Sequence, residues 1–332
     1  MRAAIVTGGA GFVGSHMVDL LLDEGFAVRV IDNLATGRLA NLEHHAKNPR
    51  LAFQQTDVCD LTADSSVFKG VELVFHFAGI GDIVPSIERP LDYMRANVTG
   101  TLAVLEAARH AAVRKVVYAA SSSCYGIARE LPTTETAPIH PEYPYALSKW
   151  LGECATLHWA HVYKLPVTSI RMFNVYGPRV RTTGVYGAVF GVFLAQKIHG
   201  RPFTVVGDGT QTRDFVFVTD VARAFLLAAE SPGSGQVFNV GAGDPQSINR
   251  LVELLGGPVV HVPARPGEPA STWADIRKAQ RDLGWKPVVS FEEGVALMLR
   301  QIDYWKDAPL WTPETITAAT RTWFQYLSDL PA

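Results

Sequence analysis

Short apolar runs alternate with amphipathic stretches along the first half of the chain. The runs predict six strands, at residues 5–7, 27–31, 51–56, 73–77, 115–120 and 167–171. Between them, apolar residues recur at helical spacing after Gly14, over residues 91–111 and from Tyr145 onward. Strands that alternate with helices predict an α/β fold of the Rossmann type, with a doubly wound parallel sheet that binds ligands beyond the carboxyl ends of its strands.

The regular alternation weakens after residue 178. A helix near residues 188–199, a strand at 203–206 and a helix after Asp220 are expected there, and the apolar run at 237–240 predicts a return to the sheet. We therefore expect a first domain over 1–178, with a return near 210–245, and a smaller irregular α+β domain mainly over 179–332. The sequence alone suggests no function for the aromatic segment 304–323.

Composition excludes several classes of function. The 332 residues contain 30 basic and 32 acidic side chains, a net charge of -2 that gives no broad electrostatic reason to bind nucleic acid or an anionic membrane. No apolar run approaches the roughly 20 residues of a membrane span. The three cysteines have no paired metal-ligand spacing, and the first strand leaves no room for a signal peptide. We expect a cytoplasmic protein without a metal site.

Three glycines follow the first strand at a spacing typical of dinucleotide-binding turns. Gly8 suits a tight turn, Gly11 lets the backbone approach a pyrophosphate, and Gly14 lets the helix pack on the strand. The triplet alone is weak in a chain with 28 glycines, but here a helix and a second strand complete a βαβ unit. That strand ends at Asp32, whose carboxylate would accept hydrogen bonds from a ribose and repel a 2′-phosphate. The pattern predicts NAD rather than NADP.

Other strand ends also present candidate ligand residues. Asp57 and Val58 follow the third strand and could contact an adenine, although a helix cap is an equal alternative for Asp57. The small residues after the fourth strand, from Ala78 to Gly81, leave space for a ligand. His76 is expected to be a hydrogen-bonded core histidine rather than a ligand or a base.

Tyr145 and Lys149 lie four residues apart in a predicted helix, so their side chains share one face. An ammonium near the phenol, together with the positive nicotinamide of NAD, would lower the tyrosine pKa from about 10. Such a pair arises by chance in many chains. Here it follows a serine run, 121–123, that ends the fifth strand behind a dinucleotide turn, and coincidence becomes a poor explanation.

Together these motifs resemble the extended short-chain dehydrogenase/reductases, and within them the NAD-dependent nucleotide-sugar epimerases and dehydratases, most closely the UDP-sugar 4-epimerases. The resemblance covers residues 1 to about 300 and includes the runs 171–178 (RMFNVYGP) and 207–214 (GDGTQTRD). It implies a homodimer in which the helices that begin near Leu91 and Tyr145 form a four-helix bundle.

The resemblance also assigns roles. Tyr145 is implied as the base that takes the proton of the sugar 4-hydroxyl, Ser121 as the hydroxyl that binds the reacting oxygen, with Ser122 able to share that task, and Lys149 as the ligand of the nicotinamide ribose. The implied cofactor contacts are Gly8, Gly11, Phe12, Val13, Gly14, Asp32, Asn33, Asp57, Val58, Phe77, Ala78, Gly79, Asn97, Tyr145 and Lys149.

For the nucleotide sugar, the resemblance implies diphosphate contacts from Asn174, Arg213 and Arg265, and a nucleoside ribose contact from Glu268. Without the resemblance, surface ion pairs of Arg213 with Asp214 and of Arg265 with Glu268 would be the simpler interpretation. Thr272 stands where some epimerases have a bulky tyrosine beside the sugar, so an N-acetyl or other large substituent is expected to fit.

Departures from the family pattern favour epimerisation. Dehydratases have an aspartate and a glutamate directly after the position of Ser121, and decarboxylases have a glutamate there, whereas this chain has Ser122 and Ser123. A dehydratase or reductase remains one alternative, and a non-catalytic NAD-binding protein is another. A uronic acid also remains open as substrate, because one carboxylate-binding residue within 179–181 would admit it.

Overall fold

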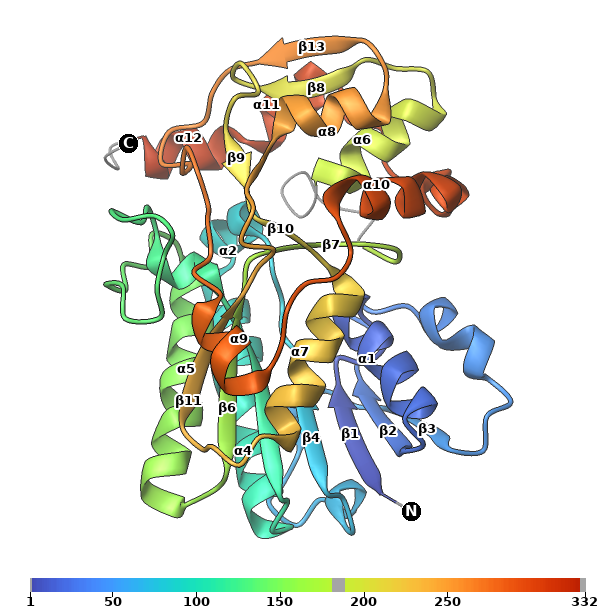
Figure 1. Ribbon diagram of the computed structural model, residues 1–332, viewed down its shortest axis with the longest axis vertical. Coiled ribbons are helices and arrows are strands. Elements are labelled where there is room, and N and C mark those ends of the chain that lie inside the picture. The colour runs from blue at the N-terminus through green and yellow to red at the C-terminus, as the bar shows by residue number, and fades with distance from the viewer. Residues whose placement is uncertain (1, 181–188, 329–332) are drawn as a thin grey trace.

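A seven-stranded parallel sheet is the frame of the molecule (Figure 1). The computed structural model describes residues 2–180 and 189–328. In spatial order the strands are β11 (Gln236–Val240), β6 (Val167–Met172), β5 (Lys115–Ser121), β4 (Leu73–His76), β1 (Ala3–Thr7), β2 (Ala27–Asp32) and β3 (Leu51–Gln55). The chain winds outward from β1 in both directions, so the switch point, where ligands bind in such sheets, lies between β1 and β4.

Helices cover both faces of the sheet, which explains why its strands are nearly continuous apolar runs. One face packs on α1 (Phe12–Asp23), α7 (Val218–Glu230) and α9 (Arg277–Leu283), in a core that includes Met17 and Phe225. The other face packs on α4 (Gly100–His110) and α5 (Pro144–Tyr163), in a core that includes Val74 and Leu105. Short helices α2 (Ile83–Glu88) and α3 (Pro90–Met94) pack against α5.

A smaller unit lies beyond the carboxyl ends of the strands, at the top of Figure 1. Its strands form three pairs, β7 (Asn174–Tyr176) with β10 (Phe215–Phe217), β8 (Phe203–Val206) with β13 (Val259–Val262), and β9 (Thr212–Arg213) with β12 (Gln246–Ser247). Its helices are α6 (Val189–Ile198), α8 (Ile248–Leu255), α10 (Phe291–Arg300), α11 (Pro313–Ala319) and α12 (Arg321–Leu327). Stacked aromatic rings, including Tyr176 on Phe190, fill its core.

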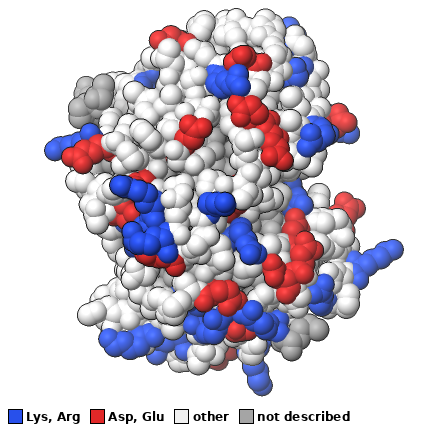
Figure 2. Space-filling model, viewed as in Figure 1, with Lys and Arg blue, Asp and Glu red and all other residues white. Residues whose placement is uncertain are grey.

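Short helical pieces lie between these elements. Within residues 2–180 and 189–328 they are 3-10 helices at Leu39–His45, Val58–Asp60, Ser66–Phe68, Ser122–Tyr125 and Ile302–Trp305, and a π-helical turn, Arg95–Thr99, between α3 and α4. None of the described helices is long and apolar enough to cross a lipid bilayer. Figure 2 shows basic and acidic side chains interspersed over the visible face, in keeping with the net charge of -2.

The predicted fold class is confirmed, and the details differ at a few elements. Strand β11 pairs in parallel with β6, so the run at 237–240 does return to the sheet. The helix predicted over 91–111 is α3, the π-helical turn and α4 in succession, and the helix predicted after Asp220 already begins at Val218. Strand β7 was not predicted, because three residues are too few to show a period.

Candidate active site

One large cavity lies between the sheet and the smaller unit. Its volume is about 670 Å³, and its wall includes the ends of β1, β2, β4 and β5 and residues of β9, α6 and α12. The predicted residues on the wall are Gly8, Gly11, Phe12, Val13, Gly14, Asp32, Asn33, Asp57, Val58, Phe77, Ala78, Gly79, Ser121, Ser122, Tyr145, Lys149, Asn174, Arg213, Arg265, Glu268 and Thr272. Candidate cofactor and substrate residues therefore share one cavity.

The glycine turn has the geometry that a bound pyrophosphate needs. Gly8 has a φ of +68°, and a Cβ there would stand 2.7 Å from the backbone nitrogen of Ala78. A Cβ on Gly14 would collide with the carbonyl oxygen of Gly8, so glycine keeps α1 close to β1. Gly11 is the N-cap residue of α1, and no side chain caps this end of the helix. The first turn of the helix faces the cavity. Helix N-termini of this kind bind phosphates.

Asp32 holds the turn from the neighbouring strand end. One carboxylate oxygen accepts from the backbone nitrogen of Ala10 at 3.0 Å, and the other accepts from that of Leu34 at 2.8 Å. Burial raises the pKa of Asp32. Each carboxylate oxygen can accept a further hydrogen bond, so the same group can hold ribose hydroxyls. The residues present fit an NAD cofactor, of which Asp32 would hold a ribose and the glycine turn the pyrophosphate.

Asp57 and His76 both have structural roles. Asp57 accepts from the backbone nitrogen of Cys59 at 2.9 Å and so caps the 3-10 turn Val58–Asp60, not the helix that was considered near Leu61, and it still lines the cavity. His76 is 1% exposed, with its ring nitrogens 2.7 Å from the hydroxyl of Thr7 and 2.9 Å from that of Thr101. Its burial lowers the pKa of His76 to about 3, so the imidazole is neutral.

Asn97 is placed behind the cavity wall rather than in it. Its side-chain amide accepts from the backbone nitrogen of Ile80 at 2.8 Å and donates to the carbonyl of Ile80 at 3.0 Å. It also donates to the hydroxyl of Ser148 at 2.8 Å. In this position Asn97 connects the loop after β4 to helix α5, and it shapes the wall through Ile80.

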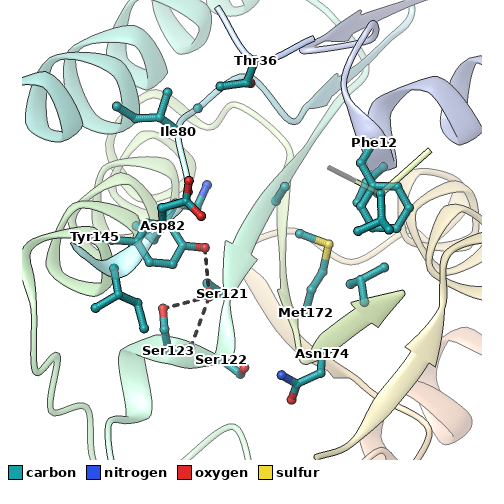
Figure 3. Close-up of a pocket in the computed structure, with 18 of the residues that line it drawn as sticks. Phe12, Thr36, Ile80, Asp82, Ser121, Ser122, Ser123, Tyr145, Met172 and Asn174 are labelled. Atoms are coloured by element: carbon teal, nitrogen blue, oxygen red, sulfur yellow. Dashed lines mark hydrogen bonds between the residues drawn. The ribbon is translucent and has the colours of Figure 1, made fainter. Parts of the chain in front are cut away.

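Tyr145 and Ser121 meet at the bottom of the cavity. The Tyr145 hydroxyl donates to Oγ of Ser121 at 3.4 Å (Figure 3). Tyr145 comes from the first turn of α5 and Ser121 from the end of β5, both of which are anchored in the sheet. Ser121 also accepts from the backbone nitrogen of Ser123 at 3.2 Å. The hydroxyl bonded to Tyr145 is that of Ser121, while Ser122 lines the cavity beside it.

The direction of the Tyr145 pKa differs from the expectation. Burial raises the pKa of Tyr145, the Ser121 hydrogen bond opposes this rise, and the charge of Asp82 adds to it. Burial also lowers the pKa of Lys149 to about 7, which weakens its ammonium as a partner for a phenolate. The Lys149 nitrogen lies 4.5 Å from the ring centre of Tyr118. In the protein alone, desolvation therefore dominates the pKa of Tyr145, and the lowering expected beside Lys149 and bound NAD stays a prediction.

Asp82 is a carboxylate that no sequence pattern predicted at this site. It follows Gly81 in the loop after β4, and Figure 3 shows it beside the ring of Tyr145. Its φ of +134° is in a region that side-chain-bearing residues seldom adopt, which marks a backbone held by its surroundings. The sequence signal at this loop was small residues only, so the charge was missed.

Two of the three predicted diphosphate residues, Arg213 and Arg265, form one cluster with Glu268. Glu268 pairs with Arg213 at 2.7 Å and with Arg265 at 3.8 Å. Arg213 also donates to the carbonyls of Thr212 at 2.8 Å and Pro269 at 2.9 Å, which fixes its guanidinium. Two guanidinium groups against one carboxylate leave a net positive charge at this cluster, which suits a diphosphate.

The alternative of surface ion pairs is wrong for Arg213. Its partner is Glu268, and Arg213 is only 8% exposed. Asp214 is fully buried and accepts instead from backbone nitrogens, including that of Ala274 at 2.8 Å. Burial raises the pKa of Asp214 to about 6.

The wall opposite Tyr145 includes two of the predicted substrate residues. The Thr272 hydroxyl donates to the side-chain oxygen of Asn174 at 2.8 Å and accepts from the backbone nitrogen of Asp214 at 3.1 Å. Arg179, considered for a uronic acid, pairs with Asp19 at 2.8 Å, and Arg181 lies outside the described residues. The wall residues missed from the sequence include Tyr143, Ile316 and Trp323.

Comparison with known proteins assigns the chain to a family. Residues 4–241 match the model of the NAD dependent epimerase/dehydratase family. The chain is 39% identical to a UDP-glucose 4-epimerase of Mycolicibacterium smegmatis over 302 residues, which is 88% of this chain and 96% of that protein. The chain belongs to the NAD-dependent epimerase/dehydratase family.

Solved structures agree with this assignment. A UDP-glucose 4-epimerase of Thermotoga maritima with UDP-glucose matches with a TM-score of 0.83 and 34% identity, over 92% of this chain and 99% of that one. A UDP-glucuronic acid 4-epimerase of Bacillus cereus, in complex with UDP-glucuronic acid and NAD, matches with a TM-score of 0.84 and 30% identity. The match covers 92% of this chain and 99% of that one. Similar matches include UDP-glucuronic acid decarboxylases of Arabidopsis thaliana and a dTDP-glucose 4,6-dehydratase of Streptomyces venezuelae.

Proposed function

We propose that the protein is an NAD-dependent 4-epimerase of a UDP-sugar that acts through a transient 4-keto sugar. The observation that supports this most is the Tyr145–Ser121 hydrogen bond, in a cavity that also contains the glycine turn and the Arg213–Glu268–Arg265 cluster. The same cavity thus contains residues that would hold NAD, a candidate base and a candidate diphosphate clamp.

The chain's own residues would handle the proton and hold the sugar. Tyr145, as phenolate, accepts the proton of the 4-hydroxyl, and Ser121 donates a hydrogen bond to the same oxygen. Bound NAD supplies a reversible hydride acceptor for C4. Arg213 and Arg265 keep the diphosphate in place while the keto sugar turns about its linkage. As the hydride comes back to the opposite face of C4, Tyr145 returns the proton to the oxygen, so the product has the opposite configuration at C4.

The residues after Ser121 favour epimerisation over elimination or decarboxylation. Ser122 and Ser123 offer hydroxyls where those reactions use a carboxylate in the family. Asp82 supports a second candidate, because its carboxylate beside Tyr145 could serve as the acid or base of a dehydratase. An Asp82→Asn variant separates the two candidate activities. Epimerase activity should persist without this carboxylate, whereas the activity of a dehydratase that uses it as acid or base should be lost.

Asp82 also bears on the choice of sugar. A carboxylate in the cavity repels the carboxylate of a uronic acid, and such repulsion discriminates between substrates. Thr272 leaves more room than a tyrosine at the same position. We therefore expect neutral UDP-sugars, UDP-glucose or UDP-N-acetylglucosamine, to react faster than UDP-glucuronate.

A homodimer is part of this proposal. Leu91 on α3 is 80% exposed, and Leu147 and Leu151 on α5 are each 39% exposed. Apolar side chains on these two helices suit a four-helix interface with a second copy. Light scattering at micromolar concentration checks this, and a monomer throughout would contradict it.

Proton NMR tests the reaction directly. The purified protein is incubated without added NAD with UDP-glucose, UDP-N-acetylglucosamine or UDP-glucuronate, and the anomeric region is followed. A new anomeric signal that grows to a constant ratio establishes epimerisation by a tightly held cofactor and identifies the sugar. No new signal with any of them, while NAD is bound, would contradict the proposed reaction or the choice of UDP.

A further inference from the structure

The C-terminal helices lie over the cavity, although they come far after the segment that the family model matches. That match ends at residue 241, whereas α11 and α12 span residues 313–327. Both helices nevertheless contribute to the cavity wall, through Ile316 and Trp323. Figure 1 shows α12 at the end of the chain, above α2. The nucleotide-binding motifs described above do not explain why these two helices line the cavity.

Trp323 connects the two sides of the cavity. Its indole nitrogen donates to the carbonyl of Pro266 at 2.7 Å, in the loop of residues 263–269 that also contains Arg265 and Glu268. Its ring centre lies 6.4 Å from that of Tyr143, which is stacked at 6.4 Å on the ring of Tyr145. One side chain, 2% exposed, thus contacts the substrate loop on one side and the catalytic segment on the other.

The rest of α12 is anchored on α2, which belongs to the sheet side of the molecule. Trp323 and Leu327 form an apolar cluster with Val84. The hydroxyl of Thr322 donates to the carboxylate of Glu88 at 3.0 Å. Helix α2 directly follows the loop of Asp82, so α12 is attached at a fixed place beside the reacting end of the cavity.

We propose that α12 is a strap across the cavity and that Trp323 is a positioning residue for the nucleotide diphosphate. Residues 263–269 lie outside any helix or strand, so ordering them costs conformational entropy when a ligand binds. The Trp323 hydrogen bond and ring contact hold the loop in place beforehand. This inference rests on the proposed function only in taking a UDP-sugar as the ligand.

The test measures UDP binding by calorimetry to the NAD-loaded protein and to its Trp323→Ala variant. We expect the variant to bind UDP about tenfold more weakly, because the loop must then be ordered on binding. With UDP-sugar, KM should rise by a similar factor while kcat stays within about threefold, since β5 and α5 still position Ser121 and Tyr145. Retention of NAD should not change.

Two further variants keep the test interpretable. Tyr326→Ala removes an aromatic side chain of the same helix that is 62% exposed, and it should leave UDP affinity unchanged. Trp323→Phe keeps a ring against Tyr143 but loses the hydrogen bond, so an intermediate affinity is expected. It also serves as the test variant if Trp323→Ala does not fold.

The outcomes separate the two proposals. UDP bound equally by the unaltered chain and by Trp323→Ala contradicts the positioning role alone. Failure of the unaltered chain to bind UDP contradicts the proposed function and the positioning role together. A lower kcat with unchanged KM in the Trp323 variants would also overturn the inference, because it would place Trp323 in the chemical step.

Discussion

The two ends of the cavity are built differently. The cofactor end consists of backbone at the ends of regular elements, where Gly8, Gly11 and Gly14 join β1 to α1 within eight residues. The substrate end consists of side chains from segments far apart in the chain, where Arg213 meets Glu268, 55 residues later, and Trp323 meets Pro266, 57 residues before it. Local backbone thus defines one end and long-range contacts define the other.

Tyr145 lies where the two ends meet, and its substitution should have the largest effect. Tyr145→Phe removes the base, and we expect turnover to fall about 10²-fold to 10⁴-fold, the usual contribution of a general base. The fold and the bound NAD should remain. Tyr143→Phe is the matched control, because Tyr143 stacks on Tyr145 and should lose little turnover. Turnover that is unchanged in Tyr145→Phe would remove Tyr145 from the mechanism.

A second variant tests the cofactor end. In Gly14→Ala the new Cβ would collide with the carbonyl of Gly8, and overpacking of this kind costs about 1–3 kcal/mol. We expect a loss of bound NAD, measured by absorbance after gel filtration, and a lower melting temperature. Gly233→Ala is the control, since its Cβ would meet only the flexible side chain of Gln236, at 3.3 Å. Full NAD retention in Gly14→Ala would show that α1 can move away from β1.

A substitution at the substrate end should lower the affinity for the substrate without loss of bound NAD. Arg213→Ala removes a charge-assisted contact to the diphosphate, worth about 1.5–3 kcal/mol, so KM should rise about 10-fold to 100-fold. NAD should stay bound, because Arg213 lies apart from the glycine turn. Arg223→Ala, whose side chain is 52% exposed, should change neither quantity. Loss of NAD in Arg213→Ala would mean that the two ends are not independent.

The smallest predicted effect concerns pH. The charge of Asp82 and burial both raise the pKa of Tyr145, and the base works as phenolate, so activity should increase with pH. Asp82→Asn removes the negative charge, which lowers the pKa of Tyr145 and moves the acid limb of the pH–activity profile to lower pH. Asp60→Asn, with a side chain 68% exposed, is the control. A shift to higher pH would show that Asp82 does not act on Tyr145 through its charge.

The same contrast explains how far the sequence could predict the molecule. The βαβ unit around Gly8, Asp32 and the return of β11 followed from apolar runs and glycine spacing, which are local signals. The pairing of Arg213 with Glu268 and the contact of Trp323 with Pro266 could not follow, because only the folded chain brings these residues together. Asp82 was missed because its position depends on an unusual backbone conformation.

For the protein alone, the pKa of Tyr145 differs from the lowering predicted for the NAD-bound enzyme, for a related reason. The helical spacing of Tyr145 and Lys149 showed that they share a face, but it contained no information on burial. Burial in the folded protein raises the pKa of the phenol and lowers that of the ammonium. Residue spacing along the chain therefore predicts which side chains are neighbours, but not how far burial removes them from water.

The most direct test of the central claim follows a deuterium label at C4 of the sugar. The purified protein, with no added NAD, is incubated with the UDP-sugar that reacts in the NMR assay, labelled with deuterium at C4. Epimerisation by transfer and return of a hydride predicts that the product keeps the deuterium at C4, with inverted configuration and no net NADH. Loss of the deuterium to solvent, its transfer to another carbon, or release of NADH in proportion to product would contradict the proposed mechanism.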